Sequence, residues 1–140
     1  MLTEDAIMIQ ATAAQTRPAA AGVRYAVGES ATRPWGSWEV LATGESYTLK
    51  RIVVIPGQRL SLQYHRFRAE HWTVVQGVAE AEINGRLSAL TAGESVYVPL
   101  GAHHRLKNIS DTPLVMIEVQ TGACLDESDI IRLDDDYARV

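Results

Sequence analysis

Short runs of β-branched and aromatic residues, each followed by turn residues, fill the chain from Trp38 onward. The runs occupy residues 49–55, 60–65, 72–75, 78–83, 96–98 and 114–119. The turn residues that follow them include Pro56-Gly57, Gly77, Asn84-Gly85, Pro99 and Thr121-Gly122. No long helical period separates the runs. Several short strands at this spacing predict an all-β sandwich or barrel.

Two of these segments allow finer predictions. Asn84-Gly85 suits a type I′ turn, because both central residues of that turn need a positive φ, so we expect a β-hairpin there. Along residues 60–65, alternation with a period of two puts Ser61, Gln63 and His65 on one strand face. That face is polar and is a candidate for chemistry.

The two ends of the chain lack the strand pattern. Residues 1–23 are rich in Ala and Thr, and we expect an N-terminal arm outside the core, either disordered or laid across a neighbouring subunit. Residues 24–140 then form the folded domain. Residues 126–136 carry six acids and interspersed apolar side chains. We expect a short helix or strand that caps the barrel, with its acids on a solvated face.

Length and composition place this pattern in one domain. The chain has 140 residues, of which 46% are hydrophobic, enough for one core. A formal net charge of −4 excludes a sequence-wide basic field for nucleic acid or membrane lipid but leaves room for a local anion pocket. The single cysteine, Cys124, excludes an intramolecular disulfide. With no apolar run near ~20 residues and an acidic start, we expect a cytoplasmic protein.

Histidine clustering is the strongest chemical signal from the residues themselves. All four histidines lie in two short segments, His65 to His71 and His103-His104. Together with Gln63 and Glu70 they offer amide, imidazole and carboxylate donors. That set suits a borderline divalent ion such as Zn²⁺, Mn²⁺, Fe²⁺, Co²⁺ or Ni²⁺.

The second histidine segment resembles a known family motif. Gly93, Pro99, Gly101, His104 and Asn108 match every fixed position of the second cupin motif, G-x5-P-x-G-x2-H-x3-N. The resemblance implies a single double-stranded β-helix, the cupin jelly-roll barrel, spanning roughly residues 24 to 125. It also implies that His104 is a metal ligand at the barrel mouth, which leaves His103 as a surface neighbour.

A narrower resemblance covers roughly residues 24 to 139. The matching segments are Arg33-Pro34-Trp35-Gly36, residues 56–63, Arg68-Ala69-Glu70-His71-Trp72, residues 97–101, His104-Arg105-Leu106, Glu118-Val119-Gln120 and Asp129-Ile130-Ile131-Arg132. They are similar to the C-terminal cupin domain of type II mannose-6-phosphate isomerases. The resemblance implies a sugar-phosphate ligand and a homodimer. In that family a guanylyltransferase domain often precedes the cupin; this chain has neither its length nor its nucleotide loop, so a separate guanylyltransferase is a candidate partner.

One departure from the family bears on the metal site. The family's first segment usually reads Q-x-H-x-H-R-x-E-H-W, and Phe67 stands here where its second histidine would be. The resemblance then implies a four-ligand set of Gln63, His65, Glu70 or His71, and His104, holding zinc by preference, with Phe67 beside the ion. The alternative is a site that has lost its metal and become a partly apolar pocket.

Isomerase chemistry assigns roles to further residues. An aldose–ketose isomerase moves a proton through an enediolate, which needs a base and a group that stabilises an oxyanion. Glu70 and His71 are the candidate bases; alternation puts them on opposite faces, and we expect Glu70 to point inward as a ligand. Guanidinium groups suit phosphate, so Lys50, Arg68 and Arg105 are the candidate substrate-binding residues, with Arg105 also at the catalytic centre.

Two functions from different classes follow. The first is a metal-dependent mannose-6-phosphate isomerase that interconverts mannose 6-phosphate and fructose 6-phosphate. The second is a non-catalytic cupin that binds a sugar phosphate or docks on a separate guanylyltransferase. Phe67 favours the second, and the remaining ligand set favours the first. A sugar epimerase or small-molecule lyase ranks below both, because one barrel hosts many chemistries.

Overall fold

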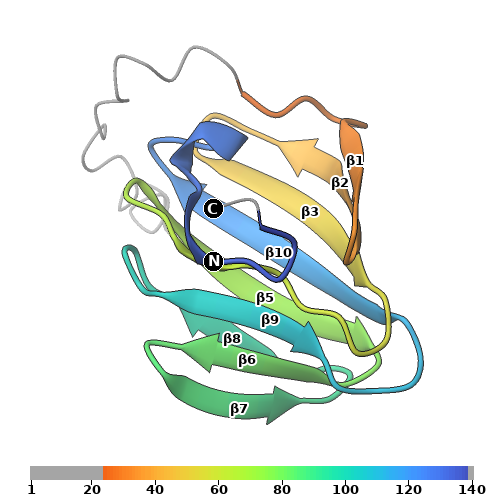
Figure 1. Cartoon of the computed structure of the whole chain (residues 1–140). Coiled ribbons are helices and arrows are strands. Elements are labelled where there is room, and N and C mark those ends of the chain that lie inside the picture. The colour runs from red at the N-terminus through yellow and green to blue at the C-terminus, as the bar shows by residue number, and fades with distance from the viewer. Residues whose placement is uncertain (1–23, 139–140) are drawn as a thin grey trace, which may run out of the picture.

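Two antiparallel sheets face each other across the core, as Figure 1 shows for the computed structural model. The structure describes residues 24–138; the predicted arm at 1–23 lies outside them. The first sheet has the order β1-β2-β3-β10-β5-β8 and the second β11-β4-β9-β6-β7. The strands of the first sheet are β1 (Ser30–Arg33), β2 (Gly36–Thr43), β3 (Tyr47–Val54), β10 (Leu114–Gly122), β5 (Arg68–Gln76) and β8 (Ser95–Val98). Those of the second are β11 (Ile131–Asp134), β4 (Leu62–Tyr64), β9 (His104–Asn108), β6 (Ala79–Ile83) and β7 (Arg86–Leu90).

Strand alternation divides the interior into an apolar part and a polar part. β3 and β10 pair in register, so that Val54 lies opposite Leu114 and Ile52 opposite Met116, all four buried. Further along the same two inward faces the sequence becomes polar, and Lys50 lies opposite Glu118. The same period-two rule therefore supplies a hydrophobic core to one end of the two strands and chargeable side chains to the other.

The apolar part of the interior is the hydrophobic core. Trp72 and Val74 from β5, Ala79 and Ala81 from β6, and Leu106 from β9 pack with the β3 and β10 residues. All three tryptophans of the chain are buried. The alternating apolar residues of the predicted strands thus face one common interior, as a sandwich or barrel requires.

The predicted hairpin is confirmed. Asn84 and Gly85 have φ of +50° and +80° and connect β6 to β7, as a type I′ turn requires. The segment 60–65 forms less strand than predicted. Only Leu62–Tyr64 is assigned to β4, and Gln63 opposite His104 is its one pair with β9.

The C-terminal segment contains both a 3-10 turn, η3 (Glu127–Asp129), and β11, so a short helix or strand here was correctly expected. Its acids are not all solvated, which corrects that part of the prediction: Asp126 and Asp129 are buried. Asp126 caps η3 by accepting from the Ser128 N–H, and the Asp129 carboxylate accepts the N–H groups of Arg66 and Phe67. Across residues 24–138 no helix combines the length and apolar character needed to cross a membrane.

Candidate metal centre and adjoining pocket

Three buried side chains converge where β4, β5 and β9 meet. His65 follows β4, Glu70 lies in β5, and His104 begins β9. One ligand atom from each lies within 4.8 Å of the others, a grouping that could hold a metal ion. All three residues are at most 2% exposed.

Both imidazoles are oriented by backbone carbonyls. His65 Nδ1 lies 2.8 Å from the Asp129 carbonyl, and His104 Nδ1 lies 2.9 Å from the Ala102 carbonyl. A proton on each Nδ1 satisfies that carbonyl and leaves a lone pair on Nε2. This is the arrangement that outer-shell partners impose on metal-binding histidines.

The two Nε2 atoms have no hydrogen-bond partner, although both are buried. They face Glu70: His65 Nε2 lies 2.9 Å from Oε2, and His104 Nε2 lies 3.7 Å from Oε1. Buried polar atoms without partners are rare in folded proteins, and two such lone pairs beside one carboxylate match the donor set of a divalent cation. The residues present therefore fit a metal.

The protonation states of His104 and Glu70 agree with binding of a metal ion. Burial lowers the pKa of His104 to about 4, which keeps its imidazole neutral near pH 7. The Glu70 carboxylate accepts a hydrogen bond from the Arg68 guanidinium at 3.3 Å, and this charged donor favours the ionised form of Glu70. A neutral imidazole and an ionised carboxylate are the forms that bind metals.

A second carboxyl, that of Glu118 in β10, lies beside the cluster. Trp72 Nε1 lies 3.0 Å from Glu70 Oε1 and 3.3 Å from Glu118 Oε1, so the indole N–H is placed between the two side chains. Gln120 Nε2 donates to Glu118 Oε2 at 2.9 Å. Burial, followed by the charge of Glu70, raises the pKa of Glu118 well above its usual value.

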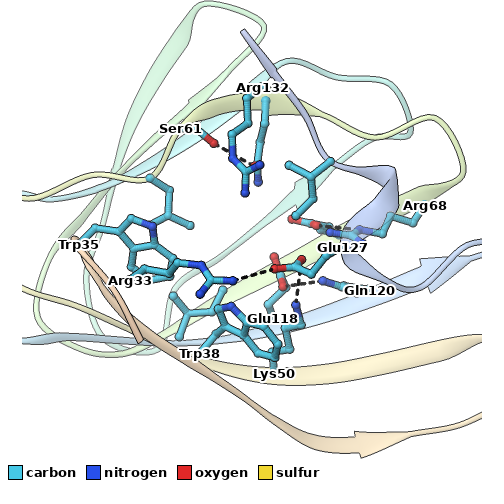
Figure 2. Close-up of a pocket in the computed structure, with 15 residues that line it drawn as sticks. Arg33, Trp35, Trp38, Lys50, Ser61, Arg68, Glu118, Gln120, Glu127 and Arg132 are labelled. Carbon is cyan, nitrogen blue, oxygen red and sulfur yellow. Dashed lines mark hydrogen bonds and ion pairs between the residues drawn. The ribbon is translucent and has the colours of Figure 1, made fainter. Parts of the chain in front are cut away.

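A pocket with about 460 Å³ of empty space, counted to its open mouth, adjoins the cluster through Glu70. Figure 2 shows its charged side chains pointing inward from several strands. A smaller cavity shares Ile52, Ser61, Gln63 and Glu118 with it and reaches His104. The residues that line the larger pocket are Arg33, Trp35, Trp38, Lys50, Ile52, Leu60, Ser61, Gln63, Arg68, Glu70, Glu118, Gln120, Glu127, Ile130 and Arg132.

Gln63 and His71, both predicted at the site, have different positions. Gln63 lines both cavities, and its Oε1 accepts a hydrogen bond from Ser61 Oγ at 3.0 Å. His71 is exposed on the outer face of β5, with its ring beside that of Tyr97. Because alternation puts Glu70 inside, it necessarily puts His71 outside, and we leave His71 out of the site.

Lys50 and Arg68 line the pocket, and both are engaged by neighbours. Lys50 Nζ lies 3.7 Å and 4.2 Å from the ring centroids of Tyr25 and Trp38, and 3.8 Å from Glu127. Burial lowers the pKa of Lys50. Arg68 Nε donates to Glu70 Oε2 at 3.3 Å; burial opposes its charge, but Glu70 outweighs burial and the pKa of Arg68 is raised.

Arg105 and Phe67 lie outside the lining of the larger pocket. Arg105 lines the smaller cavity that reaches His104. Its Nε donates to the Leu60 carbonyl and its Nη2 donates to Asp134, so it joins β9 to β11 and these two nitrogens already have acceptors. Phe67 is 39% exposed and lines neither cavity.

Sequence reasoning missed several pocket residues. The family resemblance is the only feature of the sequence that singles out four of them: Arg33, Glu118, Gln120 and Arg132. Glu118 and Gln120 stand two residues apart, as do the buried Leu114 and Met116, so the alternation of β10 carried a signal for their direction. Arg132 lies between Ile131 and Leu133 in an acidic segment, and nothing local marks its side chain as facing a pocket.

The fold places the protein among the cupins. Solved structures that match include the capsular polysaccharide assembling protein CapF from Staphylococcus aureus, with a TM-score of 0.67 and 20% identity over 76% of this chain and 34% of that one. The Schizosaccharomyces pombe Cnp3 cupin domain matches with a TM-score of 0.60 and 16% identity over 61% of this chain and 64% of that one. The predicted all-β double-stranded β-helix is confirmed.

The sequence narrows this class to one family. Residues 23–135 match the family described as "Mannose-6-phosphate isomerase C-terminal", and the chain belongs to it. Among curated relatives, the mannose-1-phosphate guanylyltransferase ManC of Salmonella typhimurium is 50% identical over 108 residues, and the alginate biosynthesis protein AlgA of Pseudomonas aeruginosa is 48% identical over 107. These matches cover 77% and 76% of this chain but only 22% of each relative.

Proposed function

We propose that the chain is a metal-dependent isomerase that interconverts mannose 6-phosphate and fructose 6-phosphate. The observation that carries this proposal is the pair of unpartnered Nε2 atoms on His65 and His104, facing Glu70 at the edge of a polar pocket. Two histidines and one glutamate form a ligand set of catalytic zinc sites, so zinc is the first choice and Mn, Fe, Co or Ni are alternatives.

The proposed ligands are His65, Glu70 and His104, with Gln63 as a fourth. When bound there, a divalent ion supplies Lewis-acid polarisation of a sugar oxygen. Gln120 contributes a further polar group: the residue lines the pocket, and its buried Oε1 has no hydrogen-bond partner, which suits a sugar hydroxyl.

We assign the proton transfer to Glu118. An aldose–ketose conversion moves a proton between neighbouring carbons and needs a base that is not occupied as a ligand. Glu118 is a buried carboxyl that lines both cavities and lies outside the three-residue cluster. The Glu118→Gln variant should keep its bound metal while kcat falls by about 10²–10⁴-fold. Loss of metal together with activity would instead make Glu118 a structural support of the site.

The direct test is a coupled assay of mannose 6-phosphate isomerisation on chelator-treated protein with each divalent metal added back. We expect turnover with at least one metal and far poorer turnover of unphosphorylated mannose, because phosphate binding orients the reacting carbons. Absence of turnover with every metal would refute the isomerase.

The second candidate is a non-catalytic module that binds a sugar phosphate or docks on a separate guanylyltransferase. Two relatives that match over most of this chain are named mannose-1-phosphate guanylyltransferases, and the chain corresponds to less than a quarter of their length. Measurable sugar-phosphate binding without turnover favours this candidate. Co-elution of this chain with a guanylyltransferase tests whether the module docks on that enzyme.

We also propose a homodimer. The outer face of β5 and β8 exposes Val75 and Tyr97, which are 54% and 56% exposed, next to His71. Exposed aliphatic and aromatic side chains on a sheet face are candidate contacts with a second copy. Light scattering after size exclusion should give twice the 15.4 kDa chain mass, and a single-chain mass would contradict it.

A further inference from the structure

The cations that line the pocket are not equivalent. Arg33 Nη2 and Lys50 Nζ approach Glu127 at 3.9 and 3.8 Å, and Arg68 Nε donates to Glu70. These three positive charges already have carboxylate partners within the protein. Among the pocket cations of residues 24–138, Arg132 alone has no ion pair to an acid.

Arg132 is also short of a hydrogen-bond partner. Its Nε is buried and unpaired although the residue as a whole is half-buried, whereas the buried guanidinium of Arg68 donates to Glu70 and to the Asp126 carbonyl. A buried donor without an acceptor is unfavourable and calls for an explanation by function or by a bound group.

The backbone holds Arg132 in place beside the polar face of β4. In β11 it lies directly opposite Gln63, whose Oε1 is fixed by Ser61 Oγ. Figure 2 shows the Arg132 side chain reaching into the pocket next to Ser61, facing the side where Arg33 and Glu127 lie. The strand pairing fixes the backbone from which the Arg132 side chain extends, so the residue stays next to Gln63.

We propose that Arg132 is the anion anchor of the pocket and binds the phosphate of a phosphorylated sugar. The planar guanidinium suits two phosphate oxygens, and an incoming phosphate would give the buried Nε its acceptor. This replaces Arg105, which is engaged with Leu60 and Asp134. The identification of the ligand as a sugar phosphate rests on the proposed function, whereas the anion subsite does not.

Calorimetric titration of the full chain with inorganic phosphate, mannose 6-phosphate and mannose tests the proposal. Arg132→Met should weaken phosphate and mannose 6-phosphate binding by about 10–100-fold, because a charge-assisted bidentate contact is lost, and leave mannose unaffected. Arg132→Lys should fall between Arg132→Met and the unchanged protein, since it keeps the charge and loses the fork. Arg51→Met is the matched control: Arg51 pairs with Glu39 outside the pocket and should bind like the unchanged protein.

Equal phosphate affinity in the unchanged protein and Arg132→Met would overturn the proposal, as would an unchanged protein that binds neither phosphate nor mannose 6-phosphate. Thermal melting confirms that each variant is folded, and Arg132→Lys decides the matter if the Met variant is not. Failure of the isomerase is a separate result: no turnover with any metal, with phosphate binding lost in Arg132→Met, refutes isomerisation and supports the anion subsite.

Discussion

His103 and His104 are adjacent in sequence and opposite in environment, which makes them a matched pair for testing the ligand cluster. His104 is buried with Nε2 facing Glu70, while His103 is exposed beside Tyr64. His104→Ala should lose most of the bound metal, since one imidazole fewer leaves coordination incomplete. His103→Ala should keep it. Metal analysis of both variants, purified without chelator, checks this; equal metal content would contradict the assignment.

Phe67 stands where the family usually has a histidine ligand. The structure changes the effect that we expect from restoring this histidine. The sequence alone would have Phe67→His restore a ligand. Its side chain is 39% exposed and lines neither cavity. We therefore expect Phe67→His to leave zinc affinity within about twofold, because a histidine at this exposed position does not complete the buried ligand set. Competition titration against a zinc indicator measures it. A tenfold gain in affinity would mean that residue 67 reaches the ion.

At the scale of elements, the C-terminal segment both closes the barrel and orients a ligand. The Asp129 carbonyl fixes His65, and its carboxylate accepts the N–H groups of Arg66 and Phe67 at 3.0 and 2.9 Å. Asp129→Ala should lower the free energy of unfolding by about 2–4 kcal/mol, because two charge-assisted hydrogen bonds are lost. Zinc affinity should fall by about tenfold through the misplaced His65.

Urea denaturation and zinc titration measure these two effects, with Asp111→Ala as the control, since Asp111 lies exposed in a turn before β10. An Asp129→Ala variant as stable as the control would show that the carboxylate does not hold this segment. Unchanged zinc affinity in a destabilised variant would show that the Asp129 carboxylate stabilises the C-terminal segment without affecting the metal centre.

The strands that sequence predicts well are those with apolar alternation, such as β3 and β10. The sequence does not predict β9 (His104–Asn108) as a strand because it is mostly polar. Four of its five residues are nevertheless buried, because β9 lies between β4 and β6 in the second sheet. Likewise Glu70 could be oriented from alternation alone, whereas Arg105 could not, because only the folded chain places Asp134 against it. The pairing of β11 with β4 joins residues more than sixty positions apart, as Arg132 and Gln63 are, and no local pattern encodes it.

At the scale of the whole molecule, one alternation pattern builds both the core and the pocket. The inward faces of β3 and β10 pass from Val54 and Leu114 to Lys50 and Glu118 within a few residues. The apolar end stabilises the barrel by removing apolar surface from water, and that stabilisation offsets the cost of burying the charged end. The fold depends on the apolar end of these strands, and the proposed chemistry depends on their charged end.

The measurement that tests the central claim most directly is isomerase turnover as a function of metal occupancy. Chelator-treated protein is titrated with zinc, or with whichever metal supports activity, while bound ion and the rate with mannose 6-phosphate are followed together. The account predicts that the rate rises with occupancy and saturates at one ion per chain, and that His104→Ala shows neither binding nor rate. Full turnover by metal-free protein, or no turnover at one ion per chain, would contradict it.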